Sequence, residues 1–193
     1  MNKKIFDYKS YEIINLFIRN SNKQMHGREI ARNLKFNQKT TQGYLNILEK
    51  SKILIKAESG KNYLYSINNN PIAESFLIIA ENYKAFSLLE DFEIKEIIKD
   101  IAKQTARPII IFGSYAKSYQ TKQSDIDILT FDKIKDFQHK YAKKIHLLTA
   151  DENNFNKELL NNEPFPLDVV NNHIAVQGAE FIIKLWLEKY GQA

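Results

Sequence analysis

The chain of 193 residues contains no cysteine, and this absence excludes both a disulfide framework and a metal site built on thiolates. Long apolar runs are absent as well, since no stretch approaches the roughly 18 residues that a membrane-spanning helix needs. The first residues, MNKKIFDYKSYEII, contain neither a long apolar stretch nor a small-residue cleavage site, so they do not resemble a signal peptide. From these absences we expect a cytoplasmic protein that makes no use of a membrane.

Charge is distributed unevenly along the chain. Residues 1–70 hold 13 Lys and Arg side chains against 5 Asp and Glu, which gives a net charge of +8. Residues 71–193 hold 15 basic and 18 acidic side chains, which gives a net charge of −3. A basic segment followed by a mildly acidic one favours a polyanion as partner of the first segment, although a solvated lysine-rich surface has the same composition.

Apolar spacing and turn residues in the first part of the chain predict three helices followed by a hairpin. The first helix ends near Asn20, the next two span 28–34 and about 38–50, and the hairpin strands are 53–57 and 62–67. The longer third helix and the hairpin come directly after the short second helix. This order of elements is typical of a winged helix-turn-helix.

The segment from Gly27 to Ile67 resembles the winged helix-turn-helix family of transcription regulators. The resemblance implies that residues 1–70 are a DNA-binding domain, with the longer helix in the major groove of double-stranded DNA and the hairpin tip against the backbone or minor groove. The residues that it assigns to DNA contact are Arg28, Gln38, Lys39, Thr40, Thr41, Gln42, Lys61 and Asn62. It also implies a homodimer. A protein-interaction module with the same fold stays an alternative.

Residues 71–106 are predicted to form a helical connector, because a break rich in Asn and Pro at 68–71 precedes two stretches of apolar residues at helical spacing. Asp91 is the predicted start of the second of these helices. The apolar side chains of the connector need a partner surface, which is either the following domain or a dimer interface.

The last part of the chain combines a buried strand with residues suited to bind phosphate and metal. The apolar run 108–112 predicts the strand, which leads directly into Gly113 and Ser114. Glycine lets the backbone approach a phosphate closely, and a serine hydroxyl with the following amides can hold one. Asp125 and Asp127 lie two apart on a second predicted strand, so their carboxylates share a face and require a common cation such as Mg²⁺.

This arrangement resembles the polymerase-beta-type nucleotidyltransferases, and most closely their smallest members, the minimal nucleotidyltransferases. The resemblance implies that residues 107–193 are a nucleotidyltransferase domain, in which Asp125 and Asp127 hold Mg²⁺ or Mn²⁺ and a nucleoside triphosphate is the substrate or ligand. The nucleotide-binding residues that it assigns are Gly113, Ser114, Lys117 and Ser124. Together with the N-terminal domain, the expected fold class is α+β.

Two positions depart from the family pattern. Ser118 stands where the family usually has glycine, and His146, on a predicted strand at 144–149, stands where the family has its third carboxylate. A histidine there is either a catalytic base or a ligand for a softer metal, because it is a poor ligand for Mg²⁺. A catalytic role for Asp125, Asp127 and His146 is therefore one of two alternatives. The other is a domain that keeps the fold but has lost catalysis. Other carboxylates that we consider for the third position are Asp132, Asp136, Asp151 and Asp168.

Three functions are compatible with these patterns. The first is transfer of a nucleoside monophosphate to a protein or nucleic-acid acceptor, for example by an antitoxin that modifies a partner toxin and represses its own operon. The second is a non-catalytic transcriptional regulator whose nucleotidyltransferase-like domain senses nucleotide or mediates dimerisation. The third is an RNA-modifying enzyme whose winged helix binds RNA. The intact Gly-Ser and Asp-x-Asp motifs favour nucleotide binding, while His146 favours the second function.

Overall fold

The computed structural model describes residues 5–19, 24–121, 124–135 and 140–191. Its contacts divide the chain into two compact units: the first comprises residues 1–80 with 186–193, and the second comprises residues 81–185. The predicted connector is thus divided, because the boundary falls inside its first helix and its second helix belongs wholly to the second unit. Within the described residues, no helix is long and apolar enough to cross a membrane.

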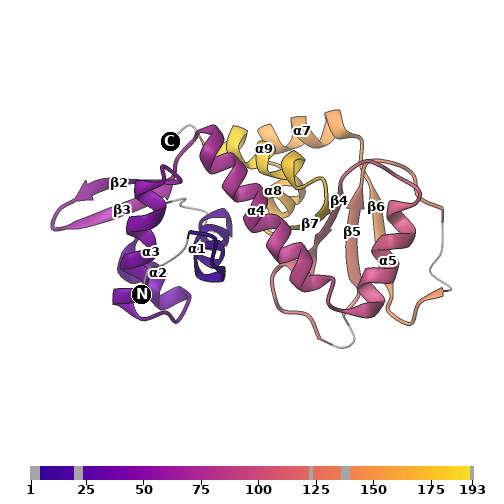
Figure 1. Cartoon of the computed structure of the whole chain (residues 1–193). Helices are drawn as coiled ribbons and strands as arrows, with labels where there is room; N and C mark the ends of the chain where they lie inside the picture. The colour runs from indigo at the N-terminus through magenta and orange to yellow at the C-terminus, as the bar shows by residue number, and fades with distance from the viewer. Residues whose placement is uncertain (1–4, 20–23, 122–123, 136–139, 192–193) are drawn as a thin grey trace. The chain divides into compact units, whose positions relative to one another are not determined.

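The first unit combines helices with an antiparallel sheet (Figure 1). Its elements in chain order are α1 (Tyr8–Arg19), β1 (Gln24–His26), α2 (Gly27–Asn33), α3 (Gln38–Lys50), β2 (Leu54–Ser59) and β3 (Asn62–Ile67). The strands pair in the order β1-β3-β2. At the tip of the hairpin Ser59 pairs with Asn62, so Gly60 and Lys61 form a two-residue turn, with Gly60 in the left-handed region at φ 59°.

Local chemistry explains where the helices of the first unit begin and what they bury. The side chain of Asn37 accepts a hydrogen bond from the Lys39 amide at 2.9 Å, and this N-cap starts α3. Ile14 and Phe17 of α1 are fully buried, as is Leu45 of α3, and these side chains form part of the core of the unit. Strand β1 is not predicted from sequence, because three residues carry too little periodicity.

The second unit contains the remaining helices and a mixed four-stranded sheet (Figure 1). The elements in chain order are α4 (Pro71–Leu88, with its first ten residues in the first unit), α5 (Phe92–Ala102), β4 (Ile109–Phe112), α6 (Gly113–Ala116), β5 (Ile126–Thr130), β6 (Ile145–Thr149), α7 (Glu152–Leu160), α8 (Pro164–Asn171), β7 (Ile174–Gln177) and α9 (Ala179–Tyr190, with its last residues in the first unit). Helices and strands in both units agree with the expected α+β class.

The sheet of the second unit has the strand order β6-β5-β4-β7, so β6 and β7 are its edge strands. Strand β4 runs antiparallel to both β5 and β7, while β5 and β6 are parallel. The register pairs Phe112 of β4 with Asp127 of β5, and Asp127 in turn with His146 of β6. Because paired residues point to one face of a sheet, these three side chains form a row across it.

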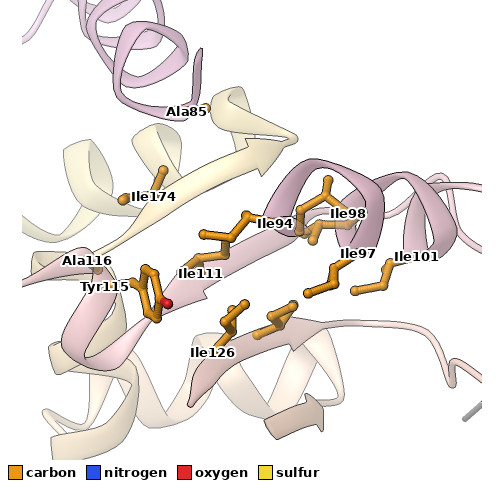
Figure 2. Close-up of a cluster of buried hydrophobic side chains, with 12 residues drawn as sticks. Ala85, Ile94, Ile97, Ile98, Ile101, Ile111, Tyr115, Ala116, Ile126 and Ile174 are labelled. Atoms are coloured by element: carbon orange, nitrogen blue, oxygen red, sulfur yellow. The ribbon is translucent and has the colours of Figure 1, made fainter. Parts of the chain in front are cut away.

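Branched side chains cover the opposite face of this sheet. The isoleucines of α5 pack against Ile111, Ile126 and other strand residues, as Figure 2 shows. The described partly buried residues on this side include Ile145 and Leu147 of β6. Alternation along each strand therefore directs Phe112, Asp127 and His146 away from α5.

Helix α8 begins with Pro-Phe-Pro, a sequence whose spacing predicts neither a helix nor a strand. Proline is tolerated in the first turn of a helix, because the amides of that turn have no intrahelical partner. Pro164 and Pro166 occupy that turn here. The helix ends near Asn172, whose side chain donates a hydrogen bond to Asp168 at 2.9 Å.

Candidate nucleotidyltransferase site

The turn after β4 depends on a glycine. Gly113 has φ 66°, a conformation that other residues adopt at a cost, and it opens the four-residue helix α6. A Cβ atom at this position would overlap the carboxylate of Asp127. Glycine thus supplies both the backbone conformation and the space that lets the Asp127 carboxylate lie against the turn. Buried Tyr115 and Ala116 hold the short helix against the core.

Two carboxylates and an imidazole meet beside this turn. The Nδ1 atom of His146 lies 3.3 Å from Oδ1 of Asp127, and the Nε2 atom lies 3.4 Å from Oδ2 of Asp125. The ring of His146 therefore stands between the two carboxylates, with one nitrogen facing each. Lys144, directly before β6, adds an ammonium group, since its Nζ atom lies 3.3 Å from Oδ2 of Asp125. Sequence reasoning missed Lys144, because only the parallel register of β5 and β6 brings it to Asp125.

The position of β6 depends on the segment that precedes it. The hydroxyl of Tyr141 donates to Oδ2 of Asp100 and to the carbonyl oxygen of Glu96, both at 3.0 Å. Burial raises the pKa of Tyr141 to about 12, and the Asp100 carboxylate adds to this rise. Hydrogen bonds from Lys103, Lys140 and Tyr141 hold the pKa of Asp100 well below its usual range. This network fixes the chain to α5 a few residues before His146.

The donor set fits a divalent cation through its two carboxylates. The side chains of Asp125 and Asp127 are 31% and 27% exposed, so solvent and ligands reach their oxygens. Carboxylate oxygens are the ligands that Mg²⁺ combines with substrate phosphates. No group of three or more His, Cys, Asp and Glu side chains in the described ranges is arranged to hold a metal ion by itself. A cation at this position would therefore take its remaining ligands from nucleotide and water.

The residues predicted to bind nucleotide separate into two pairs. Gly113 and Ser114 lie at the turn beside Asp127, and both residues are half-buried. Lys117 is instead directed to α8, because its Nζ atom donates to Oδ2 of Asp168 at 2.8 Å. The hydroxyl of Ser124 accepts a hydrogen bond from the Thr121 amide at 2.8 Å.

The other carboxylates considered for the third position have partners elsewhere. Asp132 accepts a hydrogen bond from the Thr105 hydroxyl at 2.6 Å, and Asp151 caps α7. Asp168 is paired with Lys117. Asp136 lies outside the described residues. Among the carboxylates that the structure describes, none of these takes the place that His146 occupies between Asp125 and Asp127.

Ser118, two residues after the end of α6, has φ 60°, which explains why glycine is usual at this position in the family that the sequence resembles. A serine in this region is strained, whereas glycine is not. We expect Ser118→Gly to raise the free energy of unfolding by about 0.5–1 kcal/mol in urea titrations. Ser118→Ala, which keeps a Cβ, is the matched control and should give no gain; equal gains from both variants would contradict the explanation.

The residues predicted to contact DNA belong to the first unit. A groove of about 480 Å³ is lined by five of them and by parts of α2, α3 and the β2–β3 hairpin. The five are Arg28, Gln38, Gln42, Lys61 and Asn62. Gln42 also donates hydrogen bonds to Asn46 and to the Tyr65 hydroxyl, both at 2.9 Å. Lys39 is exposed and Thr40 is half-buried on the same helix.

The prediction that Thr41 is exposed and faces DNA is wrong. Its side chain is fully buried, and its hydroxyl donates a hydrogen bond to the Asn37 carbonyl oxygen at 3.1 Å. A threonine can enter a helix interior in this way, because the carbonyl four residues earlier satisfies the hydroxyl. Thr41 therefore belongs to the inner face of α3 with Leu45 and Leu48.

Comparison with known proteins bears on the second unit. Residues 92–185 match the family model described as "Nucleotidyltransferase domain". No curated protein and no solved structure matches the chain. The matched segment begins at the first residue of α5 and includes the Gly113–Ser114 turn, the Asp125–Asp127 pair and His146. Over residues 92–185, the chain is thus similar to a nucleotidyltransferase domain.

Proposed function

We propose that this protein is a metal-dependent nucleotidyltransferase whose N-terminal unit binds double-stranded DNA. The observation that carries the proposal is the meeting of Asp125 and Asp127 beside the Gly113–Ser114 turn, within a segment that matches the nucleotidyltransferase family. This arrangement combines two carboxylates for a cation with backbone amides for a phosphate. The products are a nucleoside monophosphate joined to an acceptor and free pyrophosphate.

The reaction follows from the chemistry of these groups. A hydroxyl of the acceptor attacks the α-phosphorus of the nucleoside triphosphate, and the bond from that phosphorus to the pyrophosphate oxygen breaks. Asp125 and Asp127 would hold Mg²⁺ or Mn²⁺, which stabilises negative charge on the phosphates. Gly113 and Ser114 orient the triphosphate through their backbone. His146 stands beside both carboxylates and is the group suited to accept the proton of the attacking hydroxyl.

A transfer assay tests the enzymatic part. Purified protein is incubated with each of the four ribonucleoside triphosphates labelled at the α-phosphate, with Mg²⁺ or Mn²⁺, and with lysate from its own source. We expect label on a macromolecule, and protease or nuclease digestion then identifies the acceptor as protein, as an antitoxin-like role requires, or as nucleic acid. Absence of label with every nucleotide and both metals would contradict the proposal.

A second function is favoured by one observation. Both ring nitrogens of His146 and the ammonium of Lys144 already contact the carboxylate oxygens that a metal would need. A domain with this internal pairing is suited to bind nucleotide without transferring it, as a ligand-responsive regulator would. Tight nucleotide binding by calorimetry, combined with no label in the transfer assay, would favour this function over catalysis.

DNA binding by the first unit is supported by the order of its elements and by charge. Helix α2, helix α3 and the β2–β3 hairpin follow one another as in a winged helix, and residues 1–70 carry a net charge of +8. The groove between these elements presents Arg28 and Lys61 together with polar side chains. Basic side chains of this kind contact phosphates, while Gln38 at the start of α3 is placed for base edges.

We expect Lys39→Glu/Lys61→Glu to weaken DNA binding at least about tenfold and to reduce the slope of log affinity against log salt by about 2. For each lysine contact to a phosphate that is lost, DNA binding releases about one counterion fewer. Fluorescence anisotropy with labelled duplex DNA at several salt concentrations measures both quantities. The control, Lys95→Glu/Lys157→Glu, makes the same charge change on exposed lysines of the second unit and should alter binding little. Unchanged affinity in the first variant would indicate a protein-interaction module.

A further inference from the structure

An aromatic surface lies on the same face of the sheet as the acidic pair. Phe112 is the register partner of Asp127, so the two side chains stand next to each other on the face opposite α5. The ring of Phe165, on α8, lies 5.6 Å from the Phe112 ring at an interplanar angle of 82°. Only the Phe112 side chain therefore links Phe165 to Asp127. Neither ring has a role in the proposed transfer reaction.

Phe165 is supported from inside the protein and open to solvent on the outside. Its ring lies 6.3 Å from that of Phe155, which is only 2% exposed, whereas Phe165 itself is 39% exposed. Pro164 and Pro166 flank it in the first turn of α8. A large apolar ring in the first turn of a helix, held by the buried Phe155 and the half-buried Phe112, loses little conformational freedom when a flat ligand covers it.

An ion pair fixes this ring relative to the phosphate-binding turn. Asp168 lies three residues after Phe165, so both are on one side of α8. The Asp168 carboxylate accepts from Lys117 at 2.8 Å and from Asn172 at 2.9 Å. Lys117 directly follows α6, the helix that Gly113 and Ser114 open. The side of α8 that carries Phe165 is thereby tied to the segment proposed to bind the triphosphate.

We infer that Phe165, backed by Phe112, is the stacking surface for the base of the bound nucleoside triphosphate. This inference rests on the proposed nucleotide site, which places the phosphates at Gly113–Ser114 and leaves the base to extend along the same face. Aromatic side chains can stack on any of the bases, because every base has a π-face. A phenyl ring offers no hydrogen bond to a base edge, so Phe165 favours purines over pyrimidines through stacked area alone.

Isothermal titration calorimetry of the full chain in Mg²⁺, with ATP, CTP and inorganic tripolyphosphate as probes, tests the inference. Phe165→Ala should weaken ATP binding about tenfold and leave tripolyphosphate binding unchanged, because only ATP carries a base. Phe165→Trp should retain ATP affinity and add a tryptophan fluorescence that ATP quenches and tripolyphosphate does not. The control is Phe92→Ala, which removes a 74% exposed phenyl ring at the start of α5, and it should change neither affinity.

The outcomes separate this inference from the proposed function. Equal ATP affinity of wild type and Phe165→Ala would overturn the stacking role while leaving the nucleotide site in place. Parallel loss of ATP and tripolyphosphate binding in Phe165→Ala, with no recovery in Phe165→Trp, would show a structural role only and would also overturn it. A wild-type chain that binds neither ATP nor tripolyphosphate would overturn the proposed function and this inference together.

Discussion

Replacing Asp127 with alanine is expected to lower the rate of nucleotidyl transfer by at least about 10³-fold. Asp127 is the residue at which the elements of the site converge, since its carboxylate lies against Gly113 and contacts His146 at 3.3 Å. Its loss removes one of two carboxylates for the cation and leaves Asp125 alone. The transfer assay with α-labelled nucleotide measures the effect, under conditions where the wild type gives label.

Two controls make this result specific. Glu158→Ala removes an exposed carboxylate from α7 and should leave the transfer rate within about twofold of wild type. DNA binding by Asp127→Ala should equal that of the wild type, because the residues proposed to contact DNA all lie in the first unit. Retained transfer in Asp127→Ala would mean that the label comes from another protein or that the acidic pair is not the site.

The strands of the site could be predicted because each carries a strong local pattern. The run of isoleucines before Gly113 is apolar on both faces, as a central strand requires, and the structure has β4 there. Asp127 alternates with Ile126 and Ile128, which are buried, and this gives the carboxylate its side of the sheet. Such features depend on residues close in sequence, so they can be predicted without the fold.

The partners that complete the site are far apart in sequence and could not be predicted in this way. Lys117 and Asp168 are 51 residues apart in the sequence, and no local pattern predicts that the lysine side chain faces α8 and not a nucleotide. Phe165 has no predictable role, because the sequence Pro-Phe-Pro carries no apolar periodicity that would indicate the helix α8. Thr41 shows the opposite error: its assignment to DNA contact requires an exposed side chain, although the Asn37 carbonyl satisfies its hydroxyl inside the protein.

A buried charged cluster in the second unit is expected to contribute to the pH dependence of stability. Glu81 of α4 is fully buried, and its Oε1 atom accepts a hydrogen bond from the Ala175 amide at 2.7 Å. Its other oxygen contacts the ammonium of Lys84 and lies 3.4 Å from Nε2 of His173. Lys84 also donates to the His173 carbonyl oxygen at 2.8 Å. These contacts attach α4 to the start of edge strand β7.

Burial alone would raise the pKa of Glu81, but its interactions with His173 and Lys84 outweigh burial and lower the pKa to about 2. Because the folded pKa lies below the ordinary value of 4.5, the ionised carboxylate stabilises the native state at neutral pH. This contribution is fully present above about pH 4.5 and is lost as the pH falls toward 2. Strand β7 pairs with β4, which leads into Gly113. The cluster therefore also stabilises the strand that positions the Gly113–Ser114 turn.

Glu81→Gln is therefore expected to lower the free energy of unfolding by about 3 kcal/mol or more at pH 7, because it leaves Lys84 buried without its carboxylate. Urea unfolding followed by circular dichroism between pH 7 and pH 3 measures this. The difference from wild type should shrink as the pH falls below 4.5, since the wild-type carboxylate then also loses its charge. Glu74→Gln, on the same helix but only half-buried, should stay within about 0.5 kcal/mol of wild type. A pH-independent difference between Glu81→Gln and wild type would mean that packing, and not the charge of Glu81, holds β7 to α4.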